Sequence, residues 1–447
     1  MLTASVCGLP HAMVELRMSA QPIRLAVLGA GMRARGLCEE LRANPHRVRV
    51  VAVADPDQAR RDYFARRHEV PESGQFAGWQ EFFGKPREAD AVLVATMDRD
   101  HVGPAVATME SGYHLLLEKP MAPDLEDIVR IEQSYRAAVA KHGILAGVVH
   151  PLRYGPSFAA LKSLVDSGRI GRLITLDHLE GVGWWHQAHS FVRGNWAKRD
   201  QSSFMLLAKS CHDMDYICYL VGRPVRRVSS FGGLSWFREE NAPDGSTERC
   251  LDCPLEPECE YSAIRWYASG NRDEWPAAAV SNDHSLEAHL EALRTGPYGR
   301  CVWRAGNDVV DHQIVNMEFE DGLTASFTMT AFSQKVARRN RLHGTRAEIE
   351  FDQESVTIRD FDGNHITHQS FGDLHGGHGG ADRHILDGFL RAIEREDQTQ
   401  ITTTIPESMT THMVTFAAEH ARLSGGVVDV AAFAAEHDVQ VVWPGER

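Results

Sequence analysis

A glycine-rich turn that directly follows an apolar run constrains the fold of this chain most strongly. The run occupies residues 23–28 (IRLAVL), and the turn continues as GAGMRA from Gly29 to Ala34. Small residues in such a turn let backbone amides approach a pyrophosphate at the N-terminus of the next helix, expected at residues 35–43. The pattern therefore predicts a dinucleotide site formed by Gly29, Gly31, Met32 and Arg33.

The residue at the end of the second predicted strand indicates which dinucleotide binds. Residues 48–54 form that strand, and Asp55 follows it. A carboxylate at this position accepts hydrogen bonds from the ribose hydroxyls of NAD and repels the additional phosphate of NADP. Arg33 is the contrary sign, because an arginine beside the site could accommodate that phosphate. The sequence favours NAD as the cofactor.

Strands continue to alternate with helices as far as residue 150. Residues 91–95 lead into the segment TMDRDH, residues 96–101, and residues 114–121 read HLLLEKPM. A continuous apolar run of this kind fits a strand buried on both faces of a parallel sheet. Ligands bind beyond the carboxyl ends of such strands, so we expect cofactor contacts from Thr96, Asp98, His101, Glu118 and Lys119.

The composition argues against several classes of partner. The chain has 447 residues, 43% of them hydrophobic, and a formal net charge of −14. This charge argues against nucleic acid or an anionic membrane surface as a partner. No apolar run approaches the length of a membrane span, about 18 residues. Residues 1–22 lack the basic start and apolar core of a secretory signal, so we expect a loose extension on a cytoplasmic protein.

Three motifs together carry a family resemblance. The glycine-rich turn, residues 96–101 and the EKP tripeptide, in this order and spacing, resemble the Gfo/Idh/MocA family of nicotinamide-dependent oxidoreductases. The resemblance implies an α/β protein with a Rossmann domain, here residues 23–150, followed by a domain with a large, mostly antiparallel open sheet, here residues 151–447. It also implies a homodimer or homotetramer, a substrate pocket on the open sheet face, and a catalytic role for Lys119 beside the nicotinamide.

A second candidate catalytic group lies on a helix predicted at residues 205–220. Lys209, His212 and Asp215 lie on or near one face of that helix. The resemblance makes His212 the general base toward a sugar hydroxyl. Family members usually have an aspartate four residues before this histidine, where this chain has Ala208. We expect Lys209 to take the place of that aspartate.

Aromatic and basic residues concentrate between Gly181 and Asp200 (GVGWWHQAHSFVRGNWAKRD). Aromatic faces and hydrogen-bonding histidines suit sugar rings, which have apolar C–H faces and polar edges. A surface loop anchored by tryptophans is the alternative. We expect substrate contacts from Trp185, His186, His189, Arg193, Trp196, His150, Arg153 and Asp215. A local positive field that favours an anionic substrate is expected from Arg193, Lys198, Arg199 and Lys209.

Four cysteines accompany a polar insertion expected at about residues 239–301. Cys250, Cys253, Cys259 and Cys301 combine a Cys-x-x-Cys pair with two further thiols. Four thiolates are a ligand set of tetrahedral structural zinc sites, which is the prediction made here; free thiols and a redox role are the alternatives.

A glycine-rich segment at residues 375–382 surrounds His378. Glycines at this density allow close backbone approach to a ligand, although a flexible linker would have the same composition. The family resemblance favours a place for His378 in the substrate pocket.

Together these observations predict an NAD-dependent oxidoreductase that transfers a hydride from a ring carbon of a sugar to the nicotinamide. Two alternatives stay open. An NAD-dependent glycoside hydrolase, including one that acts on an anionic or sulfonated glycoside, would oxidise, eliminate, hydrate and reduce with recycled NAD. It would use the proton-transfer groups Lys119, Lys209, His212 and His378. A sugar or cofactor sensor without catalysis would need neither the EKP lysine nor a second base.

Overall fold

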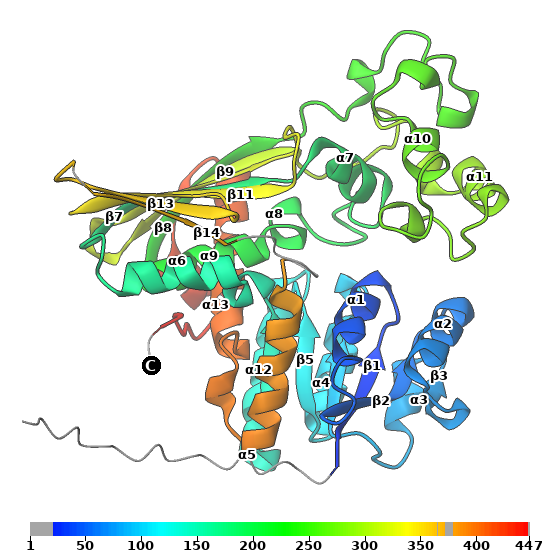
Figure 1. The fold of residues 1–447 in the computed structure, drawn as a ribbon, viewed down its shortest axis with the longest axis horizontal. Helices are drawn as coiled ribbons and strands as arrows, with labels where there is room; N and C mark the ends of the chain where they lie inside the picture. Colours follow the sequence, from blue (N-terminus) through cyan, green and yellow to red (C-terminus); the bar gives the residue numbers. More distant parts are fainter. Residues whose placement is uncertain (1–20, 364, 372–378, 446–447) are drawn as a thin grey trace, which may run out of the picture.

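The computed structural model describes residues 21–363, 365–371 and 379–445, so His378 lies outside the described residues. A parallel sheet is built from the N-terminal part of the chain and a larger mixed sheet from the C-terminal part (Figure 1). This arrangement confirms the predicted α/β class, a Rossmann domain followed by a large, mostly antiparallel sheet.

The N-terminal sheet has six parallel strands in the order β3-β2-β1-β4-β5-β6. Every residue of β4 is buried, as expected of a strand covered on both faces. The chain order reverses between β1 and β4, and such a switch point opens a crevice at the carboxyl ends of the strands. The strands are β1 (Ile23–Leu28), β2 (Val48–Ala54), β3 (Gln75–Phe76), β4 (Ala91–Val94), β5 (His114–Glu118) and β6 (Ala146–Val149). The helices of this part are α1 (Met32–Leu41), α2 (Gln58–His68), α3 (Trp79–Phe83), α4 (Val102–Glu110) and α5 (Leu125–His142).

The second sheet has nine strands in the order β14-β13-β12-β11-β7-β10-β9-β8-β15. Strands β7 and β10 pair in parallel, and the other neighbours pair antiparallel. Buried and exposed positions alternate along β9, so one face of the sheet packs on the core and the other stays open. The strands are β7 (Leu173–Gly181), β8 (Val225–Gly233), β9 (His312–Phe319), β10 (Thr324–Thr330), β11 (Ala337–Gly344), β12 (Ala347–Phe351), β13 (Ser355–Asp360), β14 (Ile366–Ser370) and β15 (Val427–Asp429).

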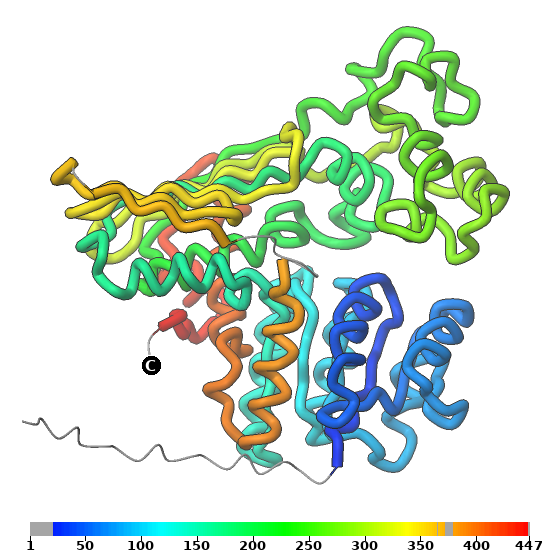
Figure 2. Tube along the Cα trace, viewed as in Figure 1, coloured from blue at the N-terminus to red at the C-terminus, as the bar shows by residue number. Residues whose placement is uncertain are grey.

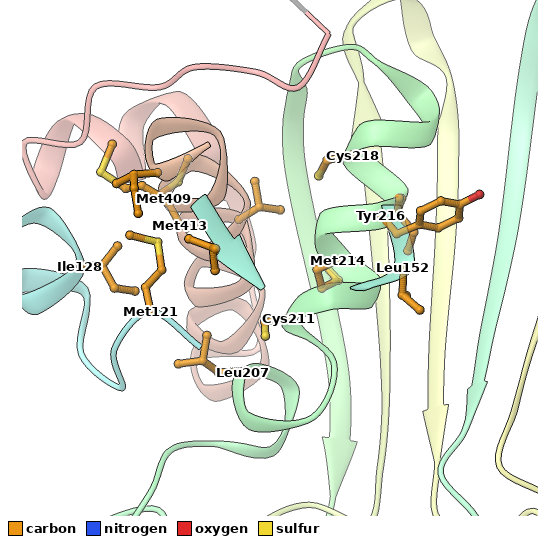
Figure 3. Close-up of a cluster of buried hydrophobic side chains, with 14 of the residues drawn as sticks. Met121, Ile128, Leu152, Leu207, Cys211, Met214, Tyr216, Cys218, Met409 and Met413 are labelled. Carbon is orange, nitrogen blue, oxygen red and sulfur yellow. The ribbon is translucent and has the colours of Figure 1, made fainter. Parts of the chain in front are cut away.

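Helices α9 (Cys211–Val221) and α13 (Ile405–Ser424) connect the two sheets. Helix α13 contacts α9 and β8 as well as α5 and β6. Figure 3 shows their buried side chains, including Met214 and Met413, together with Met121 from the turn after β5. The core between the sheets therefore anchors the turn that carries the EKP tripeptide. The remaining helices of this part are α6 (Pro156–Asp166), α12 (Ala381–Arg395) and α14 (Val430–Glu436).

Two segments differ from the sequence prediction. The helix expected at residues 205–220 is interrupted at Lys209 and Ser210 into α8 (Met205–Ala208) and α9, with Ser210 at φ −112° and ψ 11°. The tryptophan-rich segment, for which no helix was predicted, contains α7 (Trp184–His186) and a π-helix (Gln187–Arg193). Single π-helical turns occur often at functional sites.

The insertion forms a small helical unit with one apolar cluster of its own and a second that it shares with the π-helix and the end of β10. It contains α10 (Ala263–Tyr267) and α11 (Leu286–Thr295) with short 3-10 turns between them. Figures 1 and 2 show that it projects from the end of the second sheet toward the side of the molecule that carries α2 and α3.

Within the part of the chain that the structure describes, no helix combines the length and apolar character needed to cross a membrane.

Candidate active site

A cavity of about 770 Å³ lies at the carboxyl ends of the parallel strands. Its lining includes predicted cofactor residues from the ends of β1, β2 and β4: Gly29, Gly31, Met32, Arg33, Asp55, Thr96 and Asp98. Residues of the second half, His189 and Trp196 among them, complete the lining. The cavity therefore lies between the Rossmann sheet and the C-terminal part.

The glycine-rich turn has the shape that a pyrophosphate requires. Gly29 has φ +94°, and a Cβ atom there would lie 2.4 Å from the carbonyl oxygen of Ala95. A Cβ atom on Gly31 would meet nothing within 4 Å, so the space above the turn is open. Helix α1 begins at Met32 without a side-chain cap, which leaves its first amides available to an anion. These residues fit a dinucleotide phosphate group.

Asp55 lines the cavity but already accepts two backbone hydrogen bonds. Its Oδ2 accepts from the amide of Ala30 at 2.7 Å, and its Oδ1 accepts from the amide of Asp57 at 2.9 Å. A carboxylate has about four lone-pair sites. Asp55 can therefore still accept a ribose hydroxyl while it holds the glycine-rich turn in place.

Arg33 is committed to carboxylates of the protein. Its Nε lies 2.5 Å from Glu118, and its guanidinium donates to both oxygens of Asp382 at 2.6 and 2.8 Å. Glu118 also accepts from the amide of Lys119 at 3.1 Å. Arg33 and Glu118 thus join α1, β5 and α12, and the guanidinium is not free to bind the phosphate of NADP.

The segment after β4 couples the two parts of the molecule. Asp98 accepts hydrogen bonds from Trp196 Nε1 at 3.0 Å and from Ser202 Oγ at 2.9 Å. His101 is buried, and its Nδ1 lies 2.7 Å from the carbonyl oxygen of Pro120. Thr96 and Asp98 line the cavity, whereas the structure places His101 behind the EKP turn.

Lys119 reaches from the Rossmann domain to the interrupted helix. Its Nζ donates to the carbonyl oxygen of Ala208 at 2.7 Å, and its side chain stays partly exposed. Lys209, expected to replace the family aspartate at position 208, instead pairs with Glu180 of β7 at 2.8 Å. The backbone carbonyl of Ala208 therefore holds Lys119, and Lys209 has a separate acidic partner.

His212 lies in a buried ion network that strands β7 and β11 supply. Arg338 Nε lies 2.5 Å from Asp213 Oδ1 and 3.1 Å from Glu180, and Arg338 Nη2 donates to His212 Nε2 at 2.7 Å. His178 Nε2 lies 3.1 Å from Asp213. With Lys209, this group carries two positive and two negative charges, so burial of the charges is compensated within the network.

The network sets the protonation of His212 and Asp213. Burial lowers the pKa of His212 well below its ordinary value, although the Asp213 carboxylate acts in the opposite direction. Burial alone would raise the pKa of Asp213, but the charge of Arg338 together with the interactions of His212 and His178 outweighs it and holds that pKa well below the ordinary value. His212 is therefore neutral, and because its Nε2 accepts from Arg338, its proton is on Nδ1.

An aromatic group lies beside these residues. Trp185 stacks on Trp266 of the insertion at 5.5 Å and 12°, and Trp275 meets His186 at 5.0 Å and 88°. Burial, followed by the charge of Lys209, lowers the pKa of His186 well below its ordinary value. Trp185 and His186 are thus brought together with Trp266 and Trp275 of the insertion, which the sequence prediction missed, whereas Trp196 lies against Asp98.

Comparison with protein families matches both parts of the chain. Residues 23–145 match an oxidoreductase family described by its NAD-binding Rossmann fold, and residues 162–422 match the C-terminal alpha/beta domain of the same family. The chain belongs to the Gfo/Idh/MocA family.

Curated Gfo/Idh/MocA relatives resemble part of the chain. The oxidoreductase YteT of Bacillus subtilis is 24% identical over 270 residues, 59% of this chain and 60% of that protein. Inositol 2-dehydrogenase 4 of Saccharopolyspora erythraea is 28% identical over 232 residues, 52% of this chain and 62% of that protein. The scyllo-inositol 2-dehydrogenase (NAD(+)) of Bacillus subtilis is 26% identical and covers 63% of this chain and 70% of its own length. The chain thus spans 60% and 62% of the first two relatives.

Solved structures share the fold over nearly the whole chain. A levoglucosan dehydrogenase in complex with NADH and L-sorbose gives a TM-score of 0.69 at 18% identity, covering 92% of this chain and 99% of that chain. An oxidoreductase from Agrobacterium radiobacter, in complex with NAD+, L-tartaric acid and magnesium, gives 0.67 at 13% identity with the same coverage.

Three residues expected to bind substrate in this Gfo/Idh/MocA protein are sealed in its interior. Arg153 donates to both oxygens of Asp215 at 2.7 and 2.6 Å and to Glu407 at 2.8 Å. The Arg153 and Asp215 side chains have 0% exposure, which corrects the predicted substrate contacts. His150 is also fully buried, and burial lowers its pKa to about 4.

Arg193 anchors the insertion instead of binding substrate. It donates to the carbonyl oxygens of Arg300 at 2.7 Å and Tyr261 at 2.8 Å, and its Nη2 lies 3.4 Å from Cys250 Sγ. The predicted positive field is also reduced elsewhere, because Arg199 pairs with Glu419 at 2.9 Å and Lys209 is paired. Arg193, Arg199 and Lys209 are thus each engaged by groups of the protein.

The four insertion cysteines are free thiols that line one cavity of about 390 Å³. Among residues 21–363, 365–371 and 379–445, no group of three or more His, Cys, Asp or Glu side chains is placed to hold a metal ion. The four cysteines line this cavity, and the Arg193 guanidinium lies against Cys250. The structure does not support the predicted zinc site.

The polar residues that the sequence prediction missed are Asp213 of α9 and four residues of the two central strands. His178 and Glu180 alternate on the buried side of β7, and Arg338 and Asn340 do so on β11. A polar residue at an inward position of an alternating strand is unusual, and this pattern was the available signal.

Proposed function

We propose that this protein is an NAD-dependent dehydrogenase of a sugar or cyclic polyol, which moves a hydride from a ring carbinol carbon to the nicotinamide. The contact of Lys119 with Ala208 carries the proposal, because it brings the EKP lysine to the segment that bears Lys209 and His212. Relatives named as inositol dehydrogenases, and a fold relative named as a levoglucosan dehydrogenase, support this substrate class.

The cofactor residues follow from the cavity. Gly29, Gly31 and the first amides of α1 would hold the pyrophosphate, and Asp55 would accept a ribose hydroxyl. NAD, when bound, supplies the acceptor for the hydride. The pairing of Arg33 with Glu118 and Asp382 supports NAD over NADP, because this arginine offers no free charge to a second phosphate.

His212 is the proposed proton acceptor. It is neutral, and a neutral imidazole with a lone pair on Nε2 can take a proton from a substrate hydroxyl. Arg338 now donates to that lone pair, so the hydroxyl has to replace this contact while Arg338 keeps its carboxylate partners. Lys119 is proposed to donate to the same substrate oxygen. The pair of Lys209 with Glu180 maintains the charge balance around them.

The substrate would lie against the aromatic group. Trp185, His186 and Trp275 combine apolar faces with nitrogen atoms that form hydrogen bonds, which suits a ring with C–H faces and hydroxyl edges. Trp275 is 41% exposed, so part of its surface is available to a ligand.

A screen of cyclic polyols and sugars with NAD tests the proposal. The purified chain should form NADH, followed by fluorescence, with at least one ring polyol and more efficiently with NAD than with NADP. Absence of NADH formation across inositols, anhydrosugars and hexoses, with NAD bound in calorimetry, would exclude a dehydrogenase of this class.

A glycoside hydrolase that recycles NAD is the second candidate. Ala208 replaces the aspartate of ordinary family dehydrogenases, and Lys119 and Lys209 together with His212 exceed the proton-transfer groups that one oxidation requires. Aryl glycosides with catalytic NAD separate the candidates. Phenol in large excess over NADH indicates the hydrolase, and stoichiometric NADH with an intact glycosidic bond indicates the dehydrogenase.

The assembly and location of the protein remain predictions. The family resemblance leads us to expect a homodimer or homotetramer. The sequence of residues 1–22 leads us to expect a cytoplasmic location.

A further inference from the structure

The insertion supplies one wall of the cofactor cavity. Ala278, Ala279, Asn282 and Tyr298 line that cavity together with the Rossmann residues and with Trp275 of the aromatic group, and we call Ala278, Ala279, Asn282 and Tyr298 the insertion wall. Figure 1 shows the insertion, with α10 and α11, on the side of the molecule where α2 and α3 lie. The insertion therefore forms one side of the cavity, and the Rossmann domain forms the other.

The position of the insertion wall along the cavity points to the adenosine end of the dinucleotide. Beyond Asp55, the Rossmann side of the lining continues through Pro56 to Arg60 of α2 and to Gly78 and Trp79. In this fold the acid at the end of the second strand marks the adenosine ribose, so the cavity beyond it is where adenine lies.

Tyr298 connects the insertion wall to that end. Burial raises the pKa of Tyr298 to about 12, and the charge of Arg60 acts on the same phenol in the opposite direction. The phenol therefore lies within electrostatic range of the first turn of α2. His189 of the π-helix stacks on Tyr298 at 4.9 Å and 17°, which anchors the tyrosine from the other side.

The segment that bears the insertion wall is braced internally. Arg272 donates to the carbonyl oxygens of His284 at 2.8 Å and Ala268 at 2.9 Å, which closes the loop between α10 and α11. His289 Nε2 lies 3.2 Å from the carbonyl oxygen of Ala277, and the Ser285 hydroxyl caps α11. A braced segment loses little conformational freedom when it contacts a ligand.

We propose that the insertion wall binds the adenosine half of NAD and slows release of the cofactor. The proposal rests on the proposed function, which makes the cavity an NAD site. Ala278 and Ala279 permit close approach, Tyr298 offers a face for a purine, and Asn282 carries both a donor and an acceptor for its edge. The insertion thus becomes a cofactor-binding element of this chain.

Calorimetry with ADP-ribose, which contains the adenosine half and lacks nicotinamide, tests the proposal on the full chain. The variant Ala279→Glu places a negative charge on the insertion wall, and Ala288→Glu places the same charge on α11 away from the cavity lining. Ala279→Glu should weaken ADP-ribose and NAD by the same factor, about tenfold or more, and should speed dissociation of NADH. Ala288→Glu should change neither affinity more than about twofold.

Unchanged ADP-ribose affinity in Ala279→Glu would overturn the proposal. If that variant fails to fold, as judged by its thermal unfolding, Asn282→Ala replaces it, because Asn282 is exposed and its truncation removes only a polar contact. Failure of the wild type to bind either NAD or ADP-ribose would remove the proposed function as well. Wild-type binding that both wall variants retain would remove only the role of the insertion.

Discussion

Two buried ion clusters meet helix α9, and their chemistry is similar but their access differs. The interior cluster consists of Arg153, Asp215 and Glu407, and its side chains have exposures of 0%, 0% and 6%. The sheet-side cluster consists of Lys209, Glu180, His212, Asp213 and Arg338, in which Lys209 keeps 10% exposure and Arg338 7%. The sheet-side cluster also adjoins Lys119, the residue that reaches across from the Rossmann domain.

The difference in exposure separates a structural cluster from the cluster that we propose to be catalytic. Residue type and helix spacing placed Asp215 together with Lys209 and His212, yet Asp215 is paired with Arg153 and also accepts from Thr411. The interior cluster joins η3, the 3-10 turn Pro151–Tyr154, to α9 and α13, and therefore acts on stability. The sheet-side cluster adjoins Lys119 and contains a neutral histidine, so it is the cluster that we propose to act in catalysis.

The largest expected effect is on stability, from Arg153→Met. This change leaves Asp215 and Glu407 as buried charges without their arginine, and the free energy of unfolding should fall by about 3–5 kcal/mol. Urea unfolding measures it. The matched control is Arg294→Met, which breaks an exposed pair with Glu291 and should cost less than about 1 kcal/mol. Equal losses in the two variants would contradict a structural role for the interior cluster.

Lys119→Met should reduce the catalytic rate and leave stability nearly unchanged. The rate constant kcat should fall by about a hundredfold or more, because the side chain is proposed to contact the reacting oxygen. The free energy of unfolding should change by less than about 1 kcal/mol, since Lys119 is partly exposed. Lys141→Met, at an exposed lysine of α5, is the control and should change neither quantity. A Lys119 variant with wild-type kcat would refute the catalytic assignment.

Two buried histidines beside the interior cluster should make the protein sensitive to acid. Burial lowers the pKa of His150 to about 4 and that of His412 to about 3. Unfolded histidine has a pKa of about 6.5, so the unfolded state takes up protons first as the pH falls. Stability is therefore complete above about pH 6.5 and decreases below it by about 1.4 kcal/mol per pH unit for each histidine. In His150→Gln, urea unfolding between pH 6.5 and about 4 should show a shallower slope by one proton; an unchanged slope would remove His150 from this effect.

The smallest expected effect concerns the reactivity of the cysteine thiols. It tests whether burial on α9 also limits the access of a reagent to uncharged side chains. Cys211 and Cys218 of α9 are buried, and burial raises the pKa of each to about 12, whereas Cys253 and Cys259 are partly exposed. In a Cys7→Ser background, a thiol reagent should modify Cys253 and Cys259 in the native protein and leave the α9 cysteines intact. Peptide mapping identifies the sites. Metal analysis on the same sample should find no stoichiometric zinc, and zinc at one per chain would reverse the assignment.

The Rossmann half could be predicted from sequence because its signals are local. A strand, a glycine turn and an acid at the next strand end lie within a few tens of residues, and each constrains backbone geometry directly. The break between Lys209 and Cys211 could not be predicted in this way. It depends on Glu180 and on Lys119, which approach from β7 and from the end of β5.

The structure of the insertion is still harder to predict from local sequence. Four cysteines in a short segment have the spacing of a metal site, but spacing does not determine whether the sulfurs converge. In the fold, the Arg193 side chain from the π-helix enters the same cavity. The lining of the cofactor cavity by Trp275 and Tyr298 likewise depends on how the insertion packs, which no local pattern encodes.

Transfer of a ring hydrogen to the cofactor is the most direct test of the proposed dehydrogenase reaction. Cyclic polyols deuterated at their ring carbinol carbons, scyllo-inositol and levoglucosan first, are incubated with NAD and the wild-type chain, and the reduced cofactor is analysed by mass spectrometry. We predict that the NADH formed with at least one polyol contains deuterium. We also predict that this transfer is lost in Lys119→Met. Turnover of a polyol that leaves the cofactor without deuterium would contradict the proposed reaction.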